Sequence, residues 1–239
     1  MTGRLRTGVP NLDEMLNGGL LDGSITLVSG DPGAGKSTLA MKFLLEGIRN
    51  GENGAYISLD EEKRNFFRNM RTYGWSLDKL EADCSLYFEY FRTEELVSHI
   101  TDGHQTIDHQ LKKIKAKRIV IDSVTAYLSA SENQLSLRSQ IKSLFDNIRK
   151  WKVTALLIGE SLRADSNFGV DYMVDTIIRL HNNRDGGRRR RLIEVEKMRG
   201  SKHSQEAHIM EITDEGIIVK NAHITALKQE KTIYNSIIT

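Results

Sequence analysis

The stretch SGDPGAGKST, residues 29–38, follows the apolar run ITLV (25–28) and precedes a segment with helical periodicity. Residues 30–37 match the pattern G-x-x-x-x-G-K-[ST], the P-loop. The glycines leave the main chain bare, so that a phosphate can approach the backbone N–H groups closely. The next helix adds its own free N–H groups and the positive end of its dipole. The stretch therefore predicts a strand, a phosphate-binding loop and a helix, in that order.

Two side chains of this loop have tasks of their own. Lys36 places a positive charge near the β- and γ-phosphates, and Ser37 offers a hydroxyl group to a magnesium ion. The simpler alternative is a glycine-rich turn with a chance lysine, but the pattern is complete and lies between a strand and a helix. The predicted nucleotide-binding residues of the loop are Gly30, Asp31, Pro32, Gly33, Ala34, Gly35, Lys36, Ser37 and Thr38.

Three acidic residues elsewhere meet further needs of phosphate chemistry. Asp122 closes the apolar run RIVID (118–122), which we expect to be a strand neighbouring the loop strand, and is predicted to be the second magnesium anchor. Asp60 and Glu61 follow the run AYISL (55–59), also expected beside the loop strand, and are candidates for orienting or deprotonating the attacking water. Aspartates at strand ends also form turns, and acids that open a helix also complement its dipole.

Up to residue 160 the chain alternates short apolar runs with longer amphipathic segments. This alternation is typical of an α/β fold with a parallel sheet and helices on both faces. After residue 160, a polar loop precedes strands joined by short turns, which predicts an antiparallel extension of the sheet. Strands are predicted at 25–30, 54–59, 84–91, 117–122, 153–160, 174–183, 188–198, 206–213 and 215–220, and helices at 37–51, 61–75, 94–116 and 135–150.

Composition limits the class of protein. The chain has 239 residues, enough for one large domain, and its net charge of +2 gives no general argument for nucleic acid or an anionic membrane as partner. A single cysteine excludes an internal disulfide, and no apolar stretch approaches the roughly 20 residues of a membrane-spanning helix. We expect a cytoplasmic protein without membrane contact, with one domain over residues 1–222 and a tail over residues 223–239.

Several segments together resemble the KaiC-like branch of the RecA superfamily of ATPases, over roughly residues 3–221. The resemblance implies a RecA-like core that binds ATP and Mg²⁺. It also implies that Asp60 and Glu61 are the paired catalytic acids and that Thr72 lies near the nucleotide base. The segments are RTGVPNLDEMLNGGLLDGSITLVSGDPGAGKST (6–38), YISLDEE (56–62), RTYGW (71–75), RIVIDSVTAY (118–127) and GGRRRRLIEVEKMRGSKHSQEAHIMEITDEGI (186–217).

Members of that family form hexameric rings with ATP between neighbours, so the resemblance implies a homohexamer. It implies that Lys197 and Arg199 act as catalytic residues on the γ-phosphate held by a neighbouring copy. Residues two apart on a strand point the same way, although a solvated strand edge is the simpler interpretation from sequence alone. The resemblance places Arg191 near the nucleotide, and it places on the base and sugar side of the trans site Met198, Ser201, His203, Thr213 and Asp214.

Two departures from the family pattern bear on function. The chain has one domain of this kind, whereas the best-known members have two in tandem. Asp171 and Tyr172 stand where those members carry an adjacent Ser–Thr pair that becomes phosphorylated, so we do not expect autophosphorylation or a clock role. Stand-alone relatives are typical of archaea, and we expect an archaeal source.

The sequence thus predicts a slow regulatory ATPase whose ring state an unidentified protein partner reads. Two alternatives stay open. One is a RecA- or RadA-like paralogue that binds single-stranded DNA through residues 124–134 and 161–172, although these contain one arginine, Arg163, and several acids. The other is an assembly scaffold that nucleotide orders and in which hydrolysis is incidental.

Overall fold

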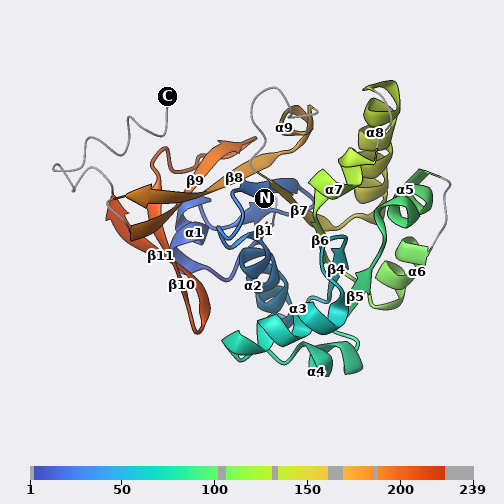
Figure 1. Cartoon of the computed structure of the whole chain (residues 1–239), viewed down its shortest axis with the longest axis horizontal. Helices are drawn as coiled ribbons and strands as arrows, with labels where there is room; N and C mark the ends of the chain where they lie inside the picture. The colour runs from blue at the N-terminus through green and yellow to red at the C-terminus, as the bar shows by residue number, and fades with distance from the viewer. Residues whose placement is uncertain (1–2, 102–105, 131–133, 161–168, 186–187, 224–239) are drawn as a thin grey trace.

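The computed structural model describes residues 3–101, 106–130, 134–160, 169–185 and 188–223 of the chain (Figure 1). A central sheet has helices on both sides, and the strands of the C-terminal part continue it, with α1 and α2 packed against β11. The predicted α/β architecture with a mostly parallel sheet is confirmed. The predicted tail lies outside the described residues except for His223, with which the last strand ends.

The described residues form one nine-stranded sheet of order β11-β10-β9-β8-β3-β7-β6-β4-β5. Pairing is parallel from β8 to β5 and antiparallel from β8 to β11, so the predicted antiparallel extension is confirmed and begins at β8. A separate two-stranded sheet joins β1 to β2. The strands are β1 (Arg4–Leu5), β2 (Leu20–Leu21), β3 (Ile25–Gly30), β4 (Gly54–Ser58), β5 (Leu86–Tyr90), β6 (Arg118–Asp122), β7 (Thr154–Glu160), β8 (Thr176–Asp185), β9 (Arg188–Met198), β10 (His208–Thr213) and β11 (Gly216–His223).

The positions predicted for two strands, the one before Asp60 and the one that ends with Asp122, are wrong. The first strand, β4, is separated from β3 by β7 and β6, and β6, which carries Asp122, is separated from β3 by β7. Alternating strands and helices predict a parallel sheet but not the spatial order of its strands. Because these strands are parallel, the acids at their carboxyl ends still share one edge of the sheet with the loop.

Each face of the sheet has its own apolar core. Val28 and Ile158 pack with α1–α4, whereas Leu27 and Leu157 pack with α5–α8, as the alternation of side chains along a strand requires. The α-helices are α1 (Pro10–Met15), α2 (Lys36–Arg49), α3 (Lys63–Met70), α4 (Leu77–Ala82), α5 (Thr93–Thr101), α6 (Thr106–Lys113), α7 (Val124–Ser129), α8 (Gln134–Trp151) and α9 (Val170–Met173).

Several helices differ from the prediction. The sequence pattern does not reveal α1, α4, α7 and α9, because segments of four to six residues are too short to show helical periodicity. The single helix predicted over residues 94–116 corresponds to α5 and α6, and residues 102–105 between them lie outside the described part.

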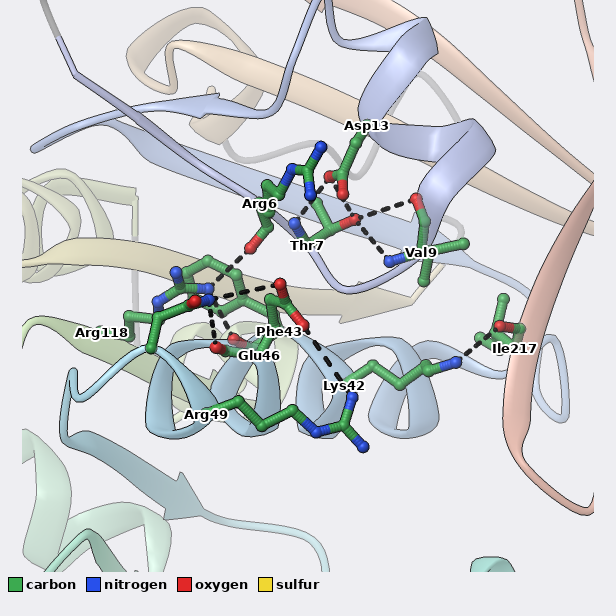
Figure 2. A network of polar contacts seen from close by, with 11 residues as sticks. Arg6, Thr7, Val9, Asp13, Lys42, Phe43, Glu46, Arg49, Arg118 and Ile217 are labelled. Carbon is green, nitrogen blue, oxygen red and sulfur yellow. Dashed lines mark hydrogen bonds and ion pairs between the residues drawn. The ribbon is translucent and has the colours of Figure 1, made fainter.

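The buried side chain of Arg118, at the start of β6, ties the N-terminal segment to α2 (Figure 2). Its Nη1 donates to the carbonyl oxygens of Arg6 and Phe43, each at 2.7 Å, and its guanidinium lies 4.6 Å from the centre of the Phe43 ring. Its Nη2 lies 2.6 Å from Glu52 Oε2 in an ion pair. These contacts fix the middle of α2, the helix that begins with the P-loop lysine.

Candidate nucleotide site

The loop between β3 and α2 requires its glycines for separate reasons. A Cβ on Gly30 would lie 2.3 Å from the carbonyl oxygen of Leu180 in β8. Gly33 and Gly35 have φ angles of +72° and +101°, which residues with side chains rarely adopt. A Cβ on Gly35 would also lie 3.1 Å from Ile212 Cδ1 in β10. The bare loop is therefore required both by its own conformation and by packing against the antiparallel strands.

Lys36 is the first residue of α2, and its side chain reaches back to the loop before the helix. Its Nζ donates to the carbonyl oxygens of Gly30 at 2.8 Å and Asp31 at 3.1 Å. Burial lowers the pKa of Lys36, and the negative charges of Asp122 and Glu160 oppose this effect. The N–H groups in the first turn of α2 have no partner within the helix, and they face the end at which the loop lies. The loop and this turn together offer donors to an anion.

Ser37 and Asp122, the two predicted magnesium residues, are in direct contact. Ser37 Oγ donates to Asp122 Oδ2 at 2.7 Å, and the fully buried hydroxyl of Tyr56 donates to the same oxygen. Burial raises the pKa of Asp122, while these two hydrogen bonds lower it. Burial, together with the charge of Asp122, raises the pKa of Tyr56 far enough to keep it a donor. A hydroxyl and a carboxylate oxygen are ligands that Mg²⁺ accepts, so the pair fits this ion.

Asp60 and Glu61 lie close to Ser37 and Asp122, and they line the same hollow. Asn69 Nδ2 donates to Glu61 Oε1 at 2.6 Å, which orients that carboxylate. Burial and then the charge of Asp122 raise the pKa of Glu61, which makes its carboxylate a stronger base. A hollow of about 170 Å³ is lined by all five residues predicted for the chemistry in one chain, which are Lys36, Ser37, Asp60, Glu61 and Asp122.

Glu160 also lines this hollow, and the sequence reasoning did not select it. It ends β7 and pairs in register with Gly30, so it lies next to the start of the loop. Its backbone N–H donates to Thr125 Oγ1 at 3.0 Å. The criterion that selected Asp122, an acid at the end of a predicted parallel strand, would have found Glu160 as well.

Strands β8 and β9 extend past the end of β3 and contact the loop from the outside. Asn182 Nδ2 donates to the carbonyl oxygen of Pro32 at 3.2 Å, and Arg191 Nε donates to that of Gly33 at 3.1 Å. Arg191, predicted to lie near the nucleotide, thus touches the loop of its own chain. Asn182 lies in the predicted strand 174–183 but in none of the segments that carry the family resemblance, and the sequence reasoning did not select it.

The residues predicted near the base lie on two segments that touch each other. Thr72 is exposed in the 3₁₀ helix η1 (Arg71–Tyr73). Trp75, further along that segment, packs against the β10–β11 turn, where a Cβ on Gly216 would lie 2.7 Å from its ring. Thr213 and Asp214 belong to this turn, and Thr213 Oγ1 donates to the carbonyl oxygen of Gly216 at 3.0 Å. The same turn also lies against α2, since a Cβ on Gly216 would be 3.4 Å from Lys42 Cδ.

Lys197 and Arg199 lie toward the other edge of the sheet. Lys197 pairs with Ile177, which in turn pairs with Leu27 in the amino-terminal half of β3. From there the loop is about 10 Å away along the strands and about 10 Å across them, at roughly 3.3 Å per residue and 4.8 Å per strand. The two side chains therefore do not reach the loop of their own chain.

Both cations instead contact main-chain oxygens of the segment around α9. Lys197 Nζ donates to the carbonyl oxygens of Asp171 at 2.7 Å and Val174 at 2.8 Å. Arg199 donates to that of Tyr172, whose side chain is 81% exposed. The common target agrees with the prediction that the two side chains point the same way.

The remaining residues of the predicted trans group are divided in space. Met198 is 5% exposed and belongs to the apolar core, so its side chain faces inward. Ser201 Oγ accepts from Arg4 at 2.6 Å, and His203 Nε2 lies 3.1 Å from Gln205 Nε2. The structure thus groups Ser201 and His203 with the segment after β9, and it places Thr213 and Asp214 apart from them, at the β10–β11 turn.

Comparison with known proteins gives the family. The sequence model described as "ATPase: KaiC" matches residues 5–224, nearly the whole chain. The chain belongs to the KaiC ATPase family. A UPF0273 protein of Thermotoga maritima is 34% identical over 92% of this chain and 96% of its own length. UPF0273 protein PF1931 of Pyrococcus furiosus is 34% identical over 92% of this chain and 94% of its own.

Two further similarities extend this assignment of the chain to the KaiC ATPase family. Circadian clock protein KaiC3 of Synechocystis is 30% identical, and the chain spans 48% of its length. The crystal structure of KaiC-like protein PH0186 from Pyrococcus horikoshii matches with a TM-score of 0.82 and 28% identity, over 92% of this chain and 100% of that one. The resemblance and the RecA-like fold are confirmed. The relatives include Thermotoga besides archaea, so they do not fix an archaeal source.

The structure bears only in part on two other predictions, those on membrane contact and on binding of single-stranded DNA. Within the described residues no helix is both long and apolar enough to cross a membrane. Of the two segments considered for single-stranded DNA, the first is largely the short helix α7, and residues 161–168 of the second lie outside the described part. DNA binding therefore stays a prediction.

Proposed function

We propose that this protein hydrolyses Mg-ATP, slowly and as a regulatory switch, at sites that a second copy of the chain completes. The observation that carries the proposal is the contact of Ser37 with Asp122 in a hollow shared with Lys36, Asp60 and Glu61. Phosphoryl transfer to water requires a phosphate cradle, a magnesium anchor and a group that positions the water. One edge of this sheet provides all three.

Lys36 is the cation of the cradle. It donates to two neutral carbonyl oxygens, and charge-assisted bonds to phosphate are roughly twice as strong as bonds between neutral partners. A nucleotide therefore replaces these acceptors with better ones at little displacement of the ammonium group. Ser37 and Asp122 would hold a magnesium ion, which would supply charge neutralisation at the phosphates.

Glu61, with Asp60 beside it, is proposed to accept the proton of the attacking water. Its raised pKa makes the carboxylate more basic, and Asn69 holds one of its oxygens in place. Base catalysis by a positioned side chain contributes about 10²–10⁴ in rate.

Lys197 and Arg199 are proposed to complete the site of a neighbouring copy. They are distant from their own loop, so only a loop of another chain is accessible to them as a phosphate contact. A repeated head-to-tail contact gives a ring when the rotation between copies closes, and we propose that it closes here into a hexamer. A cation supplied in trans contributes about 10³–10⁵ in rate. We propose that Thr72 lies on the base side of the loop in its own chain, that Thr213 and Asp214 line the base and sugar side of the trans site, and that a partner protein reads the state of the ring.

Light scattering with and without Mg-ATP, paired with phosphate release, tests assembly and catalysis together. The trans contact is tested by mixing Arg199→Ala with the double variant Asp60→Asn/Glu61→Gln. Each alone is expected to be inactive. In mixed rings about a quarter of the interfaces combine an intact loop and acids with an intact arginine, so activity should return. A mixture that assembles and stays inactive would refute the trans role.

The scaffold alternative makes a different prediction for the double variant. If nucleotide only orders the ring, Asp60→Asn/Glu61→Gln assembles with ATP and behaves normally in its pathway. If hydrolysis is the function, it assembles with ATP but does not cycle.

A further inference from the structure

We propose that Asn182 is a positioning residue for the phosphate-binding loop, an inference that rests on the nucleotide binding proposed above. β8 pairs with β3 as far as Gly30, which lies opposite Leu180. Beyond that pair β8 continues alongside the loop, which has left the sheet. Asn182 is thus the first residue past the end of β3 whose side chain contacts the loop, through Pro32.

Asn182 and its cross-strand partner hold the loop at consecutive points. Asn182 donates from Nδ2 to the Pro32 carbonyl oxygen at 3.2 Å and from its backbone N–H to Asp31 Oδ2 at 3.4 Å. Arg191, which pairs with Asn182 in register, donates to the Gly33 carbonyl oxygen at 3.1 Å. Two successive carbonyl groups of the loop are therefore drawn outward, toward β8 and β9.

The planarity of the peptide bond converts this into an orientation of N–H groups. The carbonyl of Pro32 and the N–H of Gly33 belong to one peptide unit and point in opposite directions, as do the carbonyl of Gly33 and the N–H of Ala34. Donors outside the loop thus turn these N–H groups to its inside. The Ala34 N–H indeed donates across the loop, to the Asp31 carbonyl oxygen at 3.1 Å. The inside is where a phosphate would lie.

A bound nucleotide would affect the Lys36 contacts, which lie inside the loop, but not the Asn182 contact, which lies outside it. Lys36 holds the carbonyl oxygens of Gly30 and Asp31 from within, and its ammonium is the group that a phosphate would take over. Asn182 acts from outside and does not compete with the ligand. It therefore keeps the loop in a binding shape both before and after the nucleotide arrives.

The position requires a donor of this shape. A carbonyl oxygen only accepts, so the NH₂ end of the Asn182 amide must face Pro32. Its Oδ1 is buried and has no hydrogen-bond partner within the described part of the chain, an arrangement that costs stability. Leucine has a similar volume but no donor, and aspartate would set an oxygen against the Pro32 oxygen.

The test is the affinity of Asn182→Leu for Mg-ADP and Mg-ATP, measured by calorimetry against the unchanged protein. We expect binding to weaken about five- to tenfold, the effect of one lost hydrogen bond, and equally for both nucleotides because both carry the phosphates that these amides face. Asn183→Leu is the matched control, since the next residue of a strand points to the other face. It should bind within about twofold of the unchanged protein.

The outcomes separate this inference from the proposed function. If the unchanged protein binds neither nucleotide, the proposed function fails. If it binds them and Asn182→Leu binds equally well, or if Asn183→Leu weakens binding as much, the positioning role of Asn182 is refuted. Should Asn182→Leu not fold, Asn182→Asp keeps the shape and removes the donor, and normal affinity of that variant would also overturn the inference.

Discussion

Gly47 contacts Arg118 so closely that a Cβ on Gly47 would lie 2.4 Å from Arg118 Nε. The guanidinium cannot withdraw, because Arg118 is 2% exposed and is bonded to the Arg6 and Phe43 carbonyl oxygens (Figure 2). Helix α2 therefore needs a residue without a side chain where Arg118 crosses it. The position of α2, the helix that begins with the P-loop lysine, is therefore fixed by a contact near its C-terminal end, away from the loop.

Gly47→Ala is expected to destabilise the protein by about 1–3 kcal/mol, the range for overpacking a core. The sign is informative, since the same change inside an ordinary helix stabilises by about 0.5–1 kcal/mol. Urea unfolding of the variant and the unchanged protein measures the difference.

Arg118→Met in the Gly47→Ala background provides the control. Methionine leaves room for the added methyl group, so the double variant should lose less than the sum of the two single losses. Additive losses, or a stabilising Gly47→Ala, would contradict a direct clash between these residues.

Local patterns predicted the part of the site that one segment builds. The loop and its helix read directly from residues 29–38, and Asp122 could be found because a strand end in a parallel sheet has a known edge. The order of strands could not be predicted, because helical crossovers allow several orders with the same alternation of elements. The expected neighbourhood of β4 and β3 failed for this reason, although the acids still reached the correct edge.

What the sequence did not reveal depends on contacts between distant segments. Asn182 supports the loop only because β8 extends past the end of β3. Gly47 faces Arg118 only because the first residue of β6 packs against α2. Gly216 lies far from Trp75 along the chain, yet the β10–β11 turn packs against the Trp75 ring. No periodicity within one segment encodes such pairings.

Asp122→Asn should separate stability from function. Burial raises the pKa of Asp122, so its ionised form is disfavoured in the folded protein, and the amide oxygen of asparagine can still accept from Ser37 and Tyr56. We expect a melting temperature without nucleotide that is equal or higher, and a loss of magnesium-dependent turnover of about 10²–10³-fold. Thermal scans and phosphate release check both halves. A marked fall in melting temperature would show that the charge itself stabilises the fold.

Glu61→Gln should reduce turnover by about 10²-fold or more while ATP affinity stays within about threefold, because the glutamine keeps the shape and loses only the base. Glu62→Gln is the matched control, since Glu62 is the next residue, is exposed and does not line the hollow. Single-turnover rates at saturating Mg-ATP decide the matter. Equal activity of the two variants would remove Glu61 from the mechanism.

Asp13→Asn should change how stability depends on pH. Burial raises the pKa of Asp13 above its ordinary value of 3.8, although the Thr7 N–H and hydroxyl both donate to its Oδ1 at 2.7 Å (Figure 2). In the pH range between the unfolded and the raised folded pKa, the folded state binds more protons, so this group's contribution to stability falls as pH rises. Asparagine carries no such penalty and still accepts both bonds. The free energy of unfolding of Asp13→Asn, relative to the unchanged protein, should therefore increase from pH 4 to pH 7 in urea titrations. A relative decrease over that range would mean that the ionised carboxylate is favoured in the folded state.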